Sequence, residues 1–538
     1  MAISNTKLSG PARKLPSFIL IGLTLHWLSA VATPAQQWQV HTLSLKLSNT
    51  PQQPTDTPVT VSWTHEEDGE LETPGFWNDN NEYLVRFAPP QPGQWSYEVN
   101  SPLAELDGVR GSIRVLPPES NNHGGVIISE EAPTRFRHQD GTVYYPIAFE
   151  CDWLFALDAE NGDDTPATRH FVDQLATNGF NQVVMNVFAY DVTWKKDDRL
   201  QAIHEYGSPN VFPFKGNNET PRHEHLNIEY FQRLDRVIEL LNERNIVAHL
   251  MIYVWNKRVN WPEANSEADN RYFDYVVKRY QAYPNIVWDI SKEALGYGHT
   301  DVHYITDRIH RLRKLDTHQR LVTVHDYGYC RRFPEEVDFV SAQLWSSELY
   351  SVMRHAVTAF PNKPILNIEH GGYERSPYVV FVGNYDSPEV CLERAYQCVF
   401  AGTYPTHYWQ GAAWNVIIPN PEQLPEEERP RLRYYRHLKT LVEDYQLDQL
   451  IAGEKKSASG FCLHNGSNRY VYYVPKENAR IDIRLPREFQ GQTMKAVWFD
   501  PFTGEYQDPI MRTIPRWPAF AKPQSDGFKV LIVDVLDN

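Results

Sequence analysis

The chain has 538 residues, too many for one hydrophobic core, so two to four domains are expected. Its 68 acidic residues outnumber its 52 basic residues, which gives a net charge of −16, and no basic stripe interleaved with aromatic side chains is found. Such a charge repels a phosphate backbone, so nucleic acid is excluded as an expected partner.

The first residues have the pattern of a secretory signal. Arg13 and Lys14 precede an apolar run over residues 18–28 and the small residues Ala30 and Ala32. We therefore expect residues 1–35 to be a signal peptide, cleaved on export to the periplasm or the outside of the cell. The run is too short to span a bilayer and no later stretch is long enough, so no stable membrane insertion is expected. An uncleaved anchor is the alternative interpretation.

Residues 36–117 show short alternating runs separated by turn clusters, for example at 59–63, 82–87 and 94–99. This pattern predicts a small antiparallel β-sandwich. Residues 117–125 then lack apolar periodicity and read as a linker.

Residues 126–450 alternate between predicted strands and helices. The strands are expected at 144–149, 182–188, 246–254, 286–291, 321–325, 338–344, 364–369 and 406–410. The helices are expected at 167–178, 228–243, 267–282, 301–315, 348–359, 388–400 and 430–445, with a short segment at 333–337. This order predicts an α/β fold, a closed (β/α)8 TIM barrel, rather than an open doubly wound sheet. No glycine-rich phosphate loop follows any strand, which disfavours nucleotide binding.

Beyond residue 451 the helical pattern stops. Strands are expected at 469–474, 479–485, 494–499 and 528–533. Residues 452–538 are therefore predicted to form a second small β-sandwich domain.

Two strands of the predicted barrel end in a glutamate. The fourth strand runs into Glu293 and the seventh ends at Glu369. In such a barrel the chemistry lies where the strands end. Carboxyl groups on these two strands could lie roughly 5 Å apart, the separation used by retaining glycosidases. One such glutamate alone more often caps a loop or pairs with arginine, but two on this pair of strands favour catalysis.

Further residues at the strand ends carry a specific resemblance. His325 and Tyr327 follow the fifth strand, and Trp345 and Trp409 follow the sixth and eighth. With the two glutamates, the barrel resembles glycoside hydrolase clan A. The resemblance implies that Glu293 is the acid/base and Glu369 the nucleophile, that Tyr327 hydrogen-bonds the nucleophile, and that a tryptophan stacks on the sugar. The clan usually has asparagine before its acid/base. This chain has Lys292, which leaves the usual contact to the sugar 2-hydroxyl open.

The whole chain resembles a narrower group, the apiosidase-like glycosidases. The barrel segments that carry this resemblance are 149–155, 179–181 and 288–293. Segments 83–87 and 93–97 resemble the N-terminal sandwich of unknown function in such proteins, and 496–504 resembles their final β domain, sometimes called collagen-binding. The acid/base of true apiosidases is an aspartate, so Glu293 argues against apiose as the sugar.

Polar and aromatic residues at the strand ends are predicted to contact a carbohydrate substrate. They are Asp152, Trp153, Asn186, Tyr190, Asp191, Trp255, Lys292, His325, Tyr327, Trp345 and Trp409. His223 and His225 are two apart but have no third ligand in view, and the first strand lacks the histidine pair of barrel metallohydrolases. We therefore expect no catalytic metal and no other cofactor.

The sequence thus predicts a retaining glycoside hydrolase that acts on plant or microbial polysaccharide or oligosaccharide by double displacement. The alternative from another class is a non-catalytic carbohydrate-binding or adhesion protein built on a glycosidase barrel. A metal-dependent hydrolase is a third hypothesis.

Overall fold

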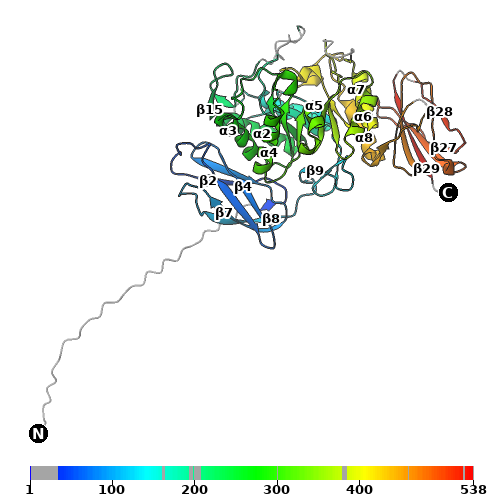
Figure 1. Cartoon of the computed structure of the whole chain (residues 1–538). Coiled ribbons are helices and arrows are strands. Elements are labelled where there is room, and N and C mark those ends of the chain that lie inside the picture. The colour runs from blue at the N-terminus through cyan, green and yellow to red at the C-terminus, as the bar shows by residue number, and fades with distance from the viewer. Residues whose placement is uncertain are drawn as a thin grey trace.

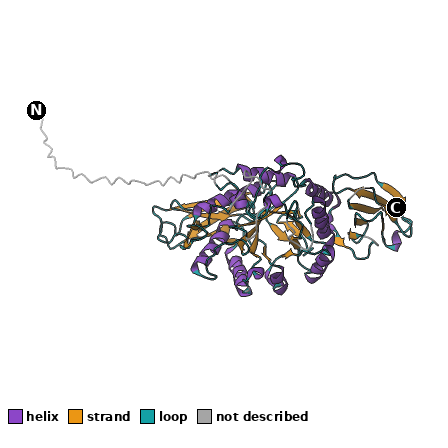
Figure 2. Cartoon of the chain, turned by 90° about the horizontal axis from the view of Figure 1, so that it is seen from above, coloured by secondary structure: helices purple, strands orange, loops and turns teal. Residues whose placement is uncertain are grey.

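The computed structural model describes residue 1 and residues 34–536, apart from residues 160, 162–163, 193–197, 199–207, 300, 378–384, 458–459 and 525–526. The predicted signal peptide therefore lies almost wholly outside the described residues. The described chain has a central barrel, an N-terminal β region below it and a C-terminal β domain beside it (Figure 1). From above, the C-terminal domain extends the molecule at one end (Figure 2). None of the described helices is long and apolar enough to cross a membrane.

Eight strands form the wall of the barrel, in the order β18-β17-β16-β13-β12-β21-β20-β19, and each paired neighbour is parallel. They are β12 (Ala148–Glu150), β13 (Gln182–Asn186), β16 (Val247–Val254), β17 (Ile286–Lys292), β18 (Val322–His325), β19 (Val340–Gln343), β20 (Ile365–Glu369) and β21 (Tyr404–His407). The predicted α/β TIM barrel is confirmed. All carboxyl ends of its strands meet at one mouth.

Helices surround this wall. They are α1 (Pro166–Thr177), α2 (Ile228–Glu243), α3 (Glu267–Tyr280), α4 (Val302–Leu315), α5 (Tyr327–Arg332), α6 (Leu349–Ala359), α7 (Pro388–Ala401) and α8 (Arg433–Tyr445). A hairpin of β14 (Phe214–Lys215) and β15 (Arg222–Leu226) precedes α2. The predicted short segment at 333–337 is preceded by α5, which begins earlier because the Asp326 carboxylate accepts a hydrogen bond from Tyr329 N at 3.1 Å.

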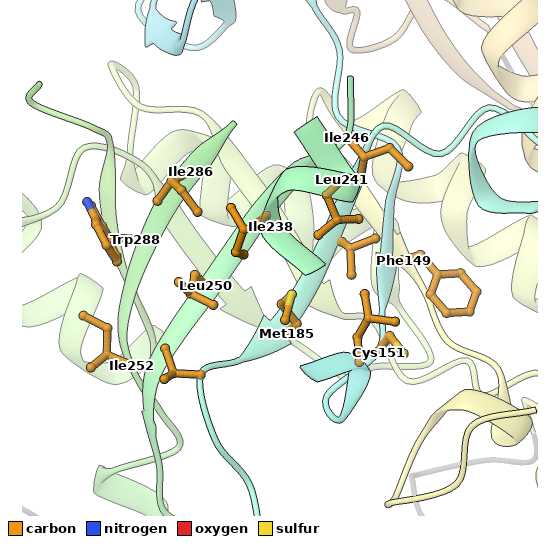
Figure 3. Close-up of a cluster of buried hydrophobic side chains, with 14 of the residues drawn as sticks. Phe149, Cys151, Met185, Ile238, Leu241, Ile246, Leu250, Ile252, Ile286 and Trp288 are labelled. Atoms are coloured by element: carbon orange, nitrogen blue, oxygen red, sulfur yellow. The ribbon is translucent and has the colours of Figure 1, made fainter. Parts of the chain in front are cut away.

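Apolar side chains on the outer face of the strands pack against the helices. Ile238 and Leu241 of α2 face Leu250 of β16, beside Ile286 and Trp288 of β17 (Figure 3). All five are almost fully buried. Because successive strand residues point to opposite faces, the alternate residues point into the barrel.

A three-stranded sheet closes the floor of the barrel. It consists of β9 (Val126–Ile128), β10 (Phe136–His138) and β11 (Val143–Tyr144). Val126, Phe136 and Tyr144 form one buried cluster with inward residues of the strands, such as Val184 and Met251. The floor is therefore lined mainly by apolar groups, and a buried chain of hydrogen bonds leads from Tyr144 through Gln182 and His249 to Asp289.

The N-terminal β region has two sheets packed face to face. One contains β1 (Ala35–Gln36), β8 (Arg110–Leu116), β7 (Gly93–Asn100), β3 (Thr60–His65) and β4 (Glu70–Pro74), and the other β2 (His41–Lys46), β6 (Glu82–Phe87) and β5 (Phe76–Trp77). Trp63 and Phe87 stack between them, 4.3 Å apart. Arg86 of β6 joins this region to the barrel, because its guanidinium pairs with Asp235 of α2 at 2.5 Å and donates to Arg279 O of α3 at 2.8 Å.

The C-terminal domain is built on two sheets. The larger contains β22 (Ile451–Ala452), β23 (Phe461–His464), β24 (Arg469–Val474), β29 (Lys529–Leu536), β26 (Thr493–Phe499) and β27 (Ile510–Thr513); the smaller pairs β25 (Arg480–Asp482) with β28 (Ala519–Ala521). Phe461 stacks on Tyr350 of α6, with ring centres 3.6 Å apart. This contact docks the domain on the barrel.

Candidate active site

Two glutamates and a glutamine meet at the mouth of the barrel. Glu293 follows β17, Gln343 ends β19 and Glu369 ends β20. Gln343 Nε2 donates to Glu293 Oε1 and to Glu369 Oε2, both at 2.8 Å. One carboxylate oxygen of Glu293, one of Glu369 and a ring nitrogen of His325 lie within 4.8 Å of one another. The two glutamates are thus close enough to act on one bond.

Irregular strand pairing aims these side chains into the barrel. The register between β17 and β18 shifts between Asp289 and Lys292, and that between β19 and β20 shifts between Ala342 and Gln343. A shift of this kind adds a residue to one strand and reverses the face to which the next side chain points. Lys292 therefore points inward, although regular alternation from the outward-facing Trp288 would place it outside.

Glu293 sits at a sharp turn out of the barrel wall. Its φ of 58° lies in the left-handed region, which a non-glycine residue adopts at a cost. Its N–H donates to His325 O at 3.1 Å, which ties the turn to β18. Glu293 Oε2 accepts a hydrogen bond from Asn256 Nδ2 at 2.7 Å. Both carboxylate oxygens of Glu293 are thus held by amide donors, since Gln343 binds the other.

Lys292 is the centre of a buried charge cluster. Its ammonium contacts Glu150 and lies 3.2 Å from both Asp152 Oδ2 and Glu369 Oε1. The side chain is only 2% exposed. A second buried cation, Lys257, lies 3.3 Å from Asp152 Oδ2. Lys292 therefore supports the nucleophile candidate Glu369 from below rather than reaching a bound sugar.

These neighbours set the protonation of the cluster. Burial acts to lower the pKa of Lys292, but the surrounding carboxylates raise it well above its usual value, so the ammonium stays charged. Burial raises the pKa of Glu369 to about 7, although Lys292 opposes this rise. For Asp152, the two lysines outweigh burial and hold its pKa below the usual value. Burial raises the pKa of Glu150 well above its usual range.

His325 lies beside the nucleophile candidate. Its Nε2 is 3.5 Å from Glu369 Oε1, and the ring is fully buried. Burial, together with the charge of Lys292, lowers the pKa of His325 well below its usual value, so the ring is neutral at neutral pH. His325 is fixed by its backbone, because His325 N donates to Asp289 Oδ1 at 2.8 Å.

The spacing of Glu293, His325 and Glu369 is one that could hold a metal ion. The charge balance disfavours it. The Lys292 ammonium, 3.2 Å from Glu369 Oε1, already supplies positive charge at this point, and a divalent cation bound there would be repelled by it.

The predicted aromatic residues divide into exposed and buried sets. Trp345 is 38% exposed and lies beside Gly371, just after β20. Trp255 is partly exposed and stacks on His299, with ring centres 3.6 Å apart. By contrast, Trp153 and Trp409 are buried. Trp345 and Trp255 are therefore the predicted tryptophans with ring surface available to a substrate.

The remaining predicted residues lie around the mouth without touching the glutamates. Asn186 is buried and donates to Asp152 O at 3.2 Å. Tyr190 donates to Glu219 at 2.9 Å, and Asp191 accepts from Asn415 at 2.6 Å. Tyr327 packs against Phe360, with ring centres 6.0 Å apart, and forms no hydrogen bond to Glu369 in the described part of the chain.

Five residues of the cluster were not predicted: Glu150, Asn256, Lys257, Gln343 and Tyr373. Four of them end or directly follow barrel strands β12, β16 or β19, and a complete survey of polar residues at strand ends would have included them. Tyr373 is nearly buried and lies in the electrostatic field of Glu369, four residues after it.

A (β/α)8 barrel with two facing glutamates on its fourth and seventh strands defines a protein of the glycoside hydrolase class. The comparisons agree. Residues 132–447 match the apiosidase-like catalytic domain, and residues 34–102 match a domain of unknown function, DUF5060. The chain belongs to the apiosidase-like family, and as its fold and family indicate, it is a glycosidase. No curated protein matches it.

Two solved structures share this architecture. A protein from Bacteroides vulgatus ATCC 8482, provisionally named a glycoside hydrolase, is 18% identical with a TM-score of 0.73, over 94% of this chain and 100% of the other. A glycoside hydrolase family 5 protein from the same organism is 17% identical with a TM-score of 0.56, over 77% of this chain and 94% of the other. At these identities the likeness concerns the fold.

Proposed function

We propose that the protein is a retaining glycoside hydrolase that acts on plant or microbial polysaccharide or oligosaccharide. The observation that carries the proposal is the approach of Glu293 and Glu369, whose nearest carboxylate oxygens lie within 4.8 Å. Retaining enzymes keep their two carboxyl groups about 5–5.5 Å apart, whereas inverting enzymes need roughly 6.5–9.5 Å to admit a water molecule.

The different surroundings of the two glutamates support their roles. Glu369 is 3% exposed and is held beside neutral His325 and Lys292, and the Lys292 ammonium favours its ionised form against the opposing effect of burial. Glu293 is only partly buried and sits on a turn at the mouth, where a leaving group would exit. We therefore assign Glu369 as the nucleophile and Glu293 as the acid/base.

The reaction proceeds in two displacements. Ionised Glu369 attacks the anomeric carbon and forms a C–O bond while the glycosidic C–O bond breaks, and Glu293 gives its proton to the leaving oxygen. Glu293, now ionised, then takes a proton from water, whose oxygen attacks the anomeric carbon and releases Glu369. Two inversions leave the configuration of the sugar unchanged.

The test is a panel of polysaccharides and 4-nitrophenyl glycosides, assayed for reducing ends or nitrophenol. The anomer that forms first is then identified by proton NMR. We expect cleavage with retained configuration, and no cleavage by Glu369→Gln measured in parallel. Inverted product would contradict the retaining mechanism, and binding of a polysaccharide without cleavage would favour an adhesion protein.

We also propose that the protein is exported after removal of a signal peptide. The basic residues and the apolar run over residues 18–28 support this proposal. The native protein from its source cell should begin near residue 36 when its N-terminal peptide is sequenced by mass spectrometry. Recovery of a protein that begins at Met1 in the membrane fraction would contradict it.

A further inference from the structure

The Gln343 amide has both of its N–H groups committed to the two glutamates. An amide nitrogen carries two hydrogens, and Gln343 Nε2 lies 2.8 Å from Glu293 Oε1 and 2.8 Å from Glu369 Oε2. Among the described residues, Gln343 is the side chain whose hydrogen bonds connect the two glutamates. The amide therefore lies where an anomeric carbon and its neighbouring hydroxyl must fit.

This arrangement is weakened when the acid/base is protonated. A carboxylic acid donates through its O–H, and the oxygen that carries the proton is a weaker acceptor of an N–H than a carboxylate oxygen is. In the free enzyme both oxygens of Glu293 accept from amides, Oε2 from Asn256 and Oε1 from Gln343. Protonation of either oxygen for the proposed reaction therefore weakens the bond that this oxygen accepts.

Gln343 is the donor that can move. Asn256 is 5% exposed, whereas the Gln343 side chain is only partly buried. Gln343 also lies on the side of Glu293 that faces Glu369, and this is the side that an attacked sugar occupies. Its partner Glu293 Oε1 is thus the oxygen that faces the scissile bond, while Asn256 continues to hold Oε2.

We propose that Gln343 determines specificity at the sugar hydroxyl next to the anomeric carbon. When a substrate enters, one N–H of Gln343 leaves Glu293 Oε1 and donates to the 2-hydroxyl oxygen, while the other stays on Glu369 Oε2. Glu293 Oε1 is then free to carry the proton for the leaving oxygen. This inference rests on the proposed glycosidase function.

The position of Lys292 supports the assignment. As the residue before the acid/base, Lys292 occupies the place from which a side chain could otherwise reach the 2-hydroxyl. Its ammonium is instead surrounded by Glu150, Asp152 and Glu369, and it is 2% exposed. Gln343 comes from another strand, β19, but it also contacts the carboxylate of the nucleophile Glu369. Hydrogen bonds to the 2-hydroxyl strengthen in the transition state of glycosidases, so this exchange would act on catalysis.

The test is a double-mutant cycle between protein and substrate. The variant is Gln343→Leu, which keeps the approximate size of the side chain and removes the N–H groups. The probes are the 4-nitrophenyl glycoside that the wild-type enzyme cleaves best and its 2-deoxy analogue. Asn256→Leu is the matched control, since it removes the amide donor of the other Glu293 oxygen. Thermal unfolding shows that each variant is folded.

For the wild type we expect kcat/KM to fall about 100-fold on the 2-deoxy probe, the usual scale for a hydrogen bond to a charged transition state. Gln343→Leu should lose about 100-fold on the parent glycoside but less than about 5-fold on the 2-deoxy probe, because the partner hydroxyl is already absent. Asn256→Leu should lose the same factor on both probes.

Two failures are distinguishable. If Gln343→Leu loses the same factor on both probes while the wild type cleaves them, Gln343 only positions the glutamates and the inference is overturned, but the proposed function stands. If the folded wild type cleaves no glycoside or polysaccharide in the panel, the proposed function falls and the inference falls with it.

Discussion

The Lys292 ammonium lies 3.2 Å from Glu369 Oε1, inside the wall of the barrel. Burial raises the pKa of Glu369 to about 7, and Lys292 opposes that rise. A nucleophile has to be ionised, and a carboxylate is ionised above its pKa. We therefore expect kcat/KM of the wild-type enzyme to fall as pH decreases through about 7, measured with the cleaved 4-nitrophenyl glycoside.

Substitution of Lys292 extends this prediction. Lys292→Met removes a cation that stabilises ionised Glu369, so the acidic limb of the pH profile should move to higher pH. Lys257→Met is the matched control, because Lys257 pairs with Asp152 and has a smaller influence on Glu369. It should shift the limb less. An unmoved limb in folded Lys292→Met would contradict this role. Lys292→Arg, which keeps the charge, should stay close to the wild type if it folds.

The difference between the site residues predicted from the sequence and those found in the structure has a physical cause. The ends of β17 and β20 were predictable because an apolar run that terminates in a glutamate is a local pattern, and the two strands share one mouth. The inward position of Lys292 was not predictable, because it depends on a register shift after Asp289 that regular alternation does not encode. Gln343 needed no such shift, because the extra residue between β19 and β20 lies in β20, and a complete survey of polar residues at the strand ends would have included it.

The exposure of the aromatic residues was also not predictable from the sequence. Trp345 and Trp409 both follow strands, so the sequence predicts a sugar-stacking role equally for each of them. In the structure Trp345 is 38% exposed, whereas Trp409 is 2% exposed and covered by Gly411 and its neighbours. Exposure depends on how the loops fold over the mouth, and this is a long-range property.

Substitution of Arg86 tests whether its ion pair with Asp235 attaches the N-terminal region to the barrel. Arg86→Met removes a buried cation and leaves Asp235 with Arg279 as its remaining partner at 2.7 Å. Because one partner remains, the loss in the free energy of unfolding should be about 2–4 kcal/mol, at or below the usual range for a broken buried pair. Denaturant unfolding measures it. Arg110→Met, which breaks an exposed pair with Glu98, should leave stability nearly unchanged. Equal effects of the two would contradict a structural role for Arg86.

A chelator separates the proposed mechanism from a metal-dependent one. The three groups spaced for a metal include Glu369, beside which Lys292 already carries positive charge. Activity should therefore be unchanged after dialysis against EDTA, measured by nitrophenol release. If activity disappears and returns with a single divalent ion, Glu293, His325 and Glu369 act as metal ligands and the double displacement is wrong.

The two glutamates should respond differently to substitution. Glu369→Gln should lose at least about 1,000-fold in activity on every substrate, because the covalent step is removed. Glu293→Ala should still form the glycosyl-enzyme from an aryl glycoside with a good leaving group, which needs little protonation. Azide should then accelerate Glu293→Ala and give a glycosyl azide of retained configuration, with no such rescue in Glu369→Gln. Reversed behaviour would exchange the two roles.

The most direct test of the account is to trap the covalent intermediate on Glu369. A 2-deoxy-2-fluoro glycoside of the cleaved sugar, with dinitrophenolate as leaving group, slows the second step more than release of its leaving group and lets the glycosyl-enzyme accumulate. Peptide mass spectrometry should then find one sugar on the peptide that contains Glu369, and none in Glu369→Gln. A sugar attached to Glu293, or steady turnover of natural substrate by an enzyme that never forms a covalent adduct, would contradict the account.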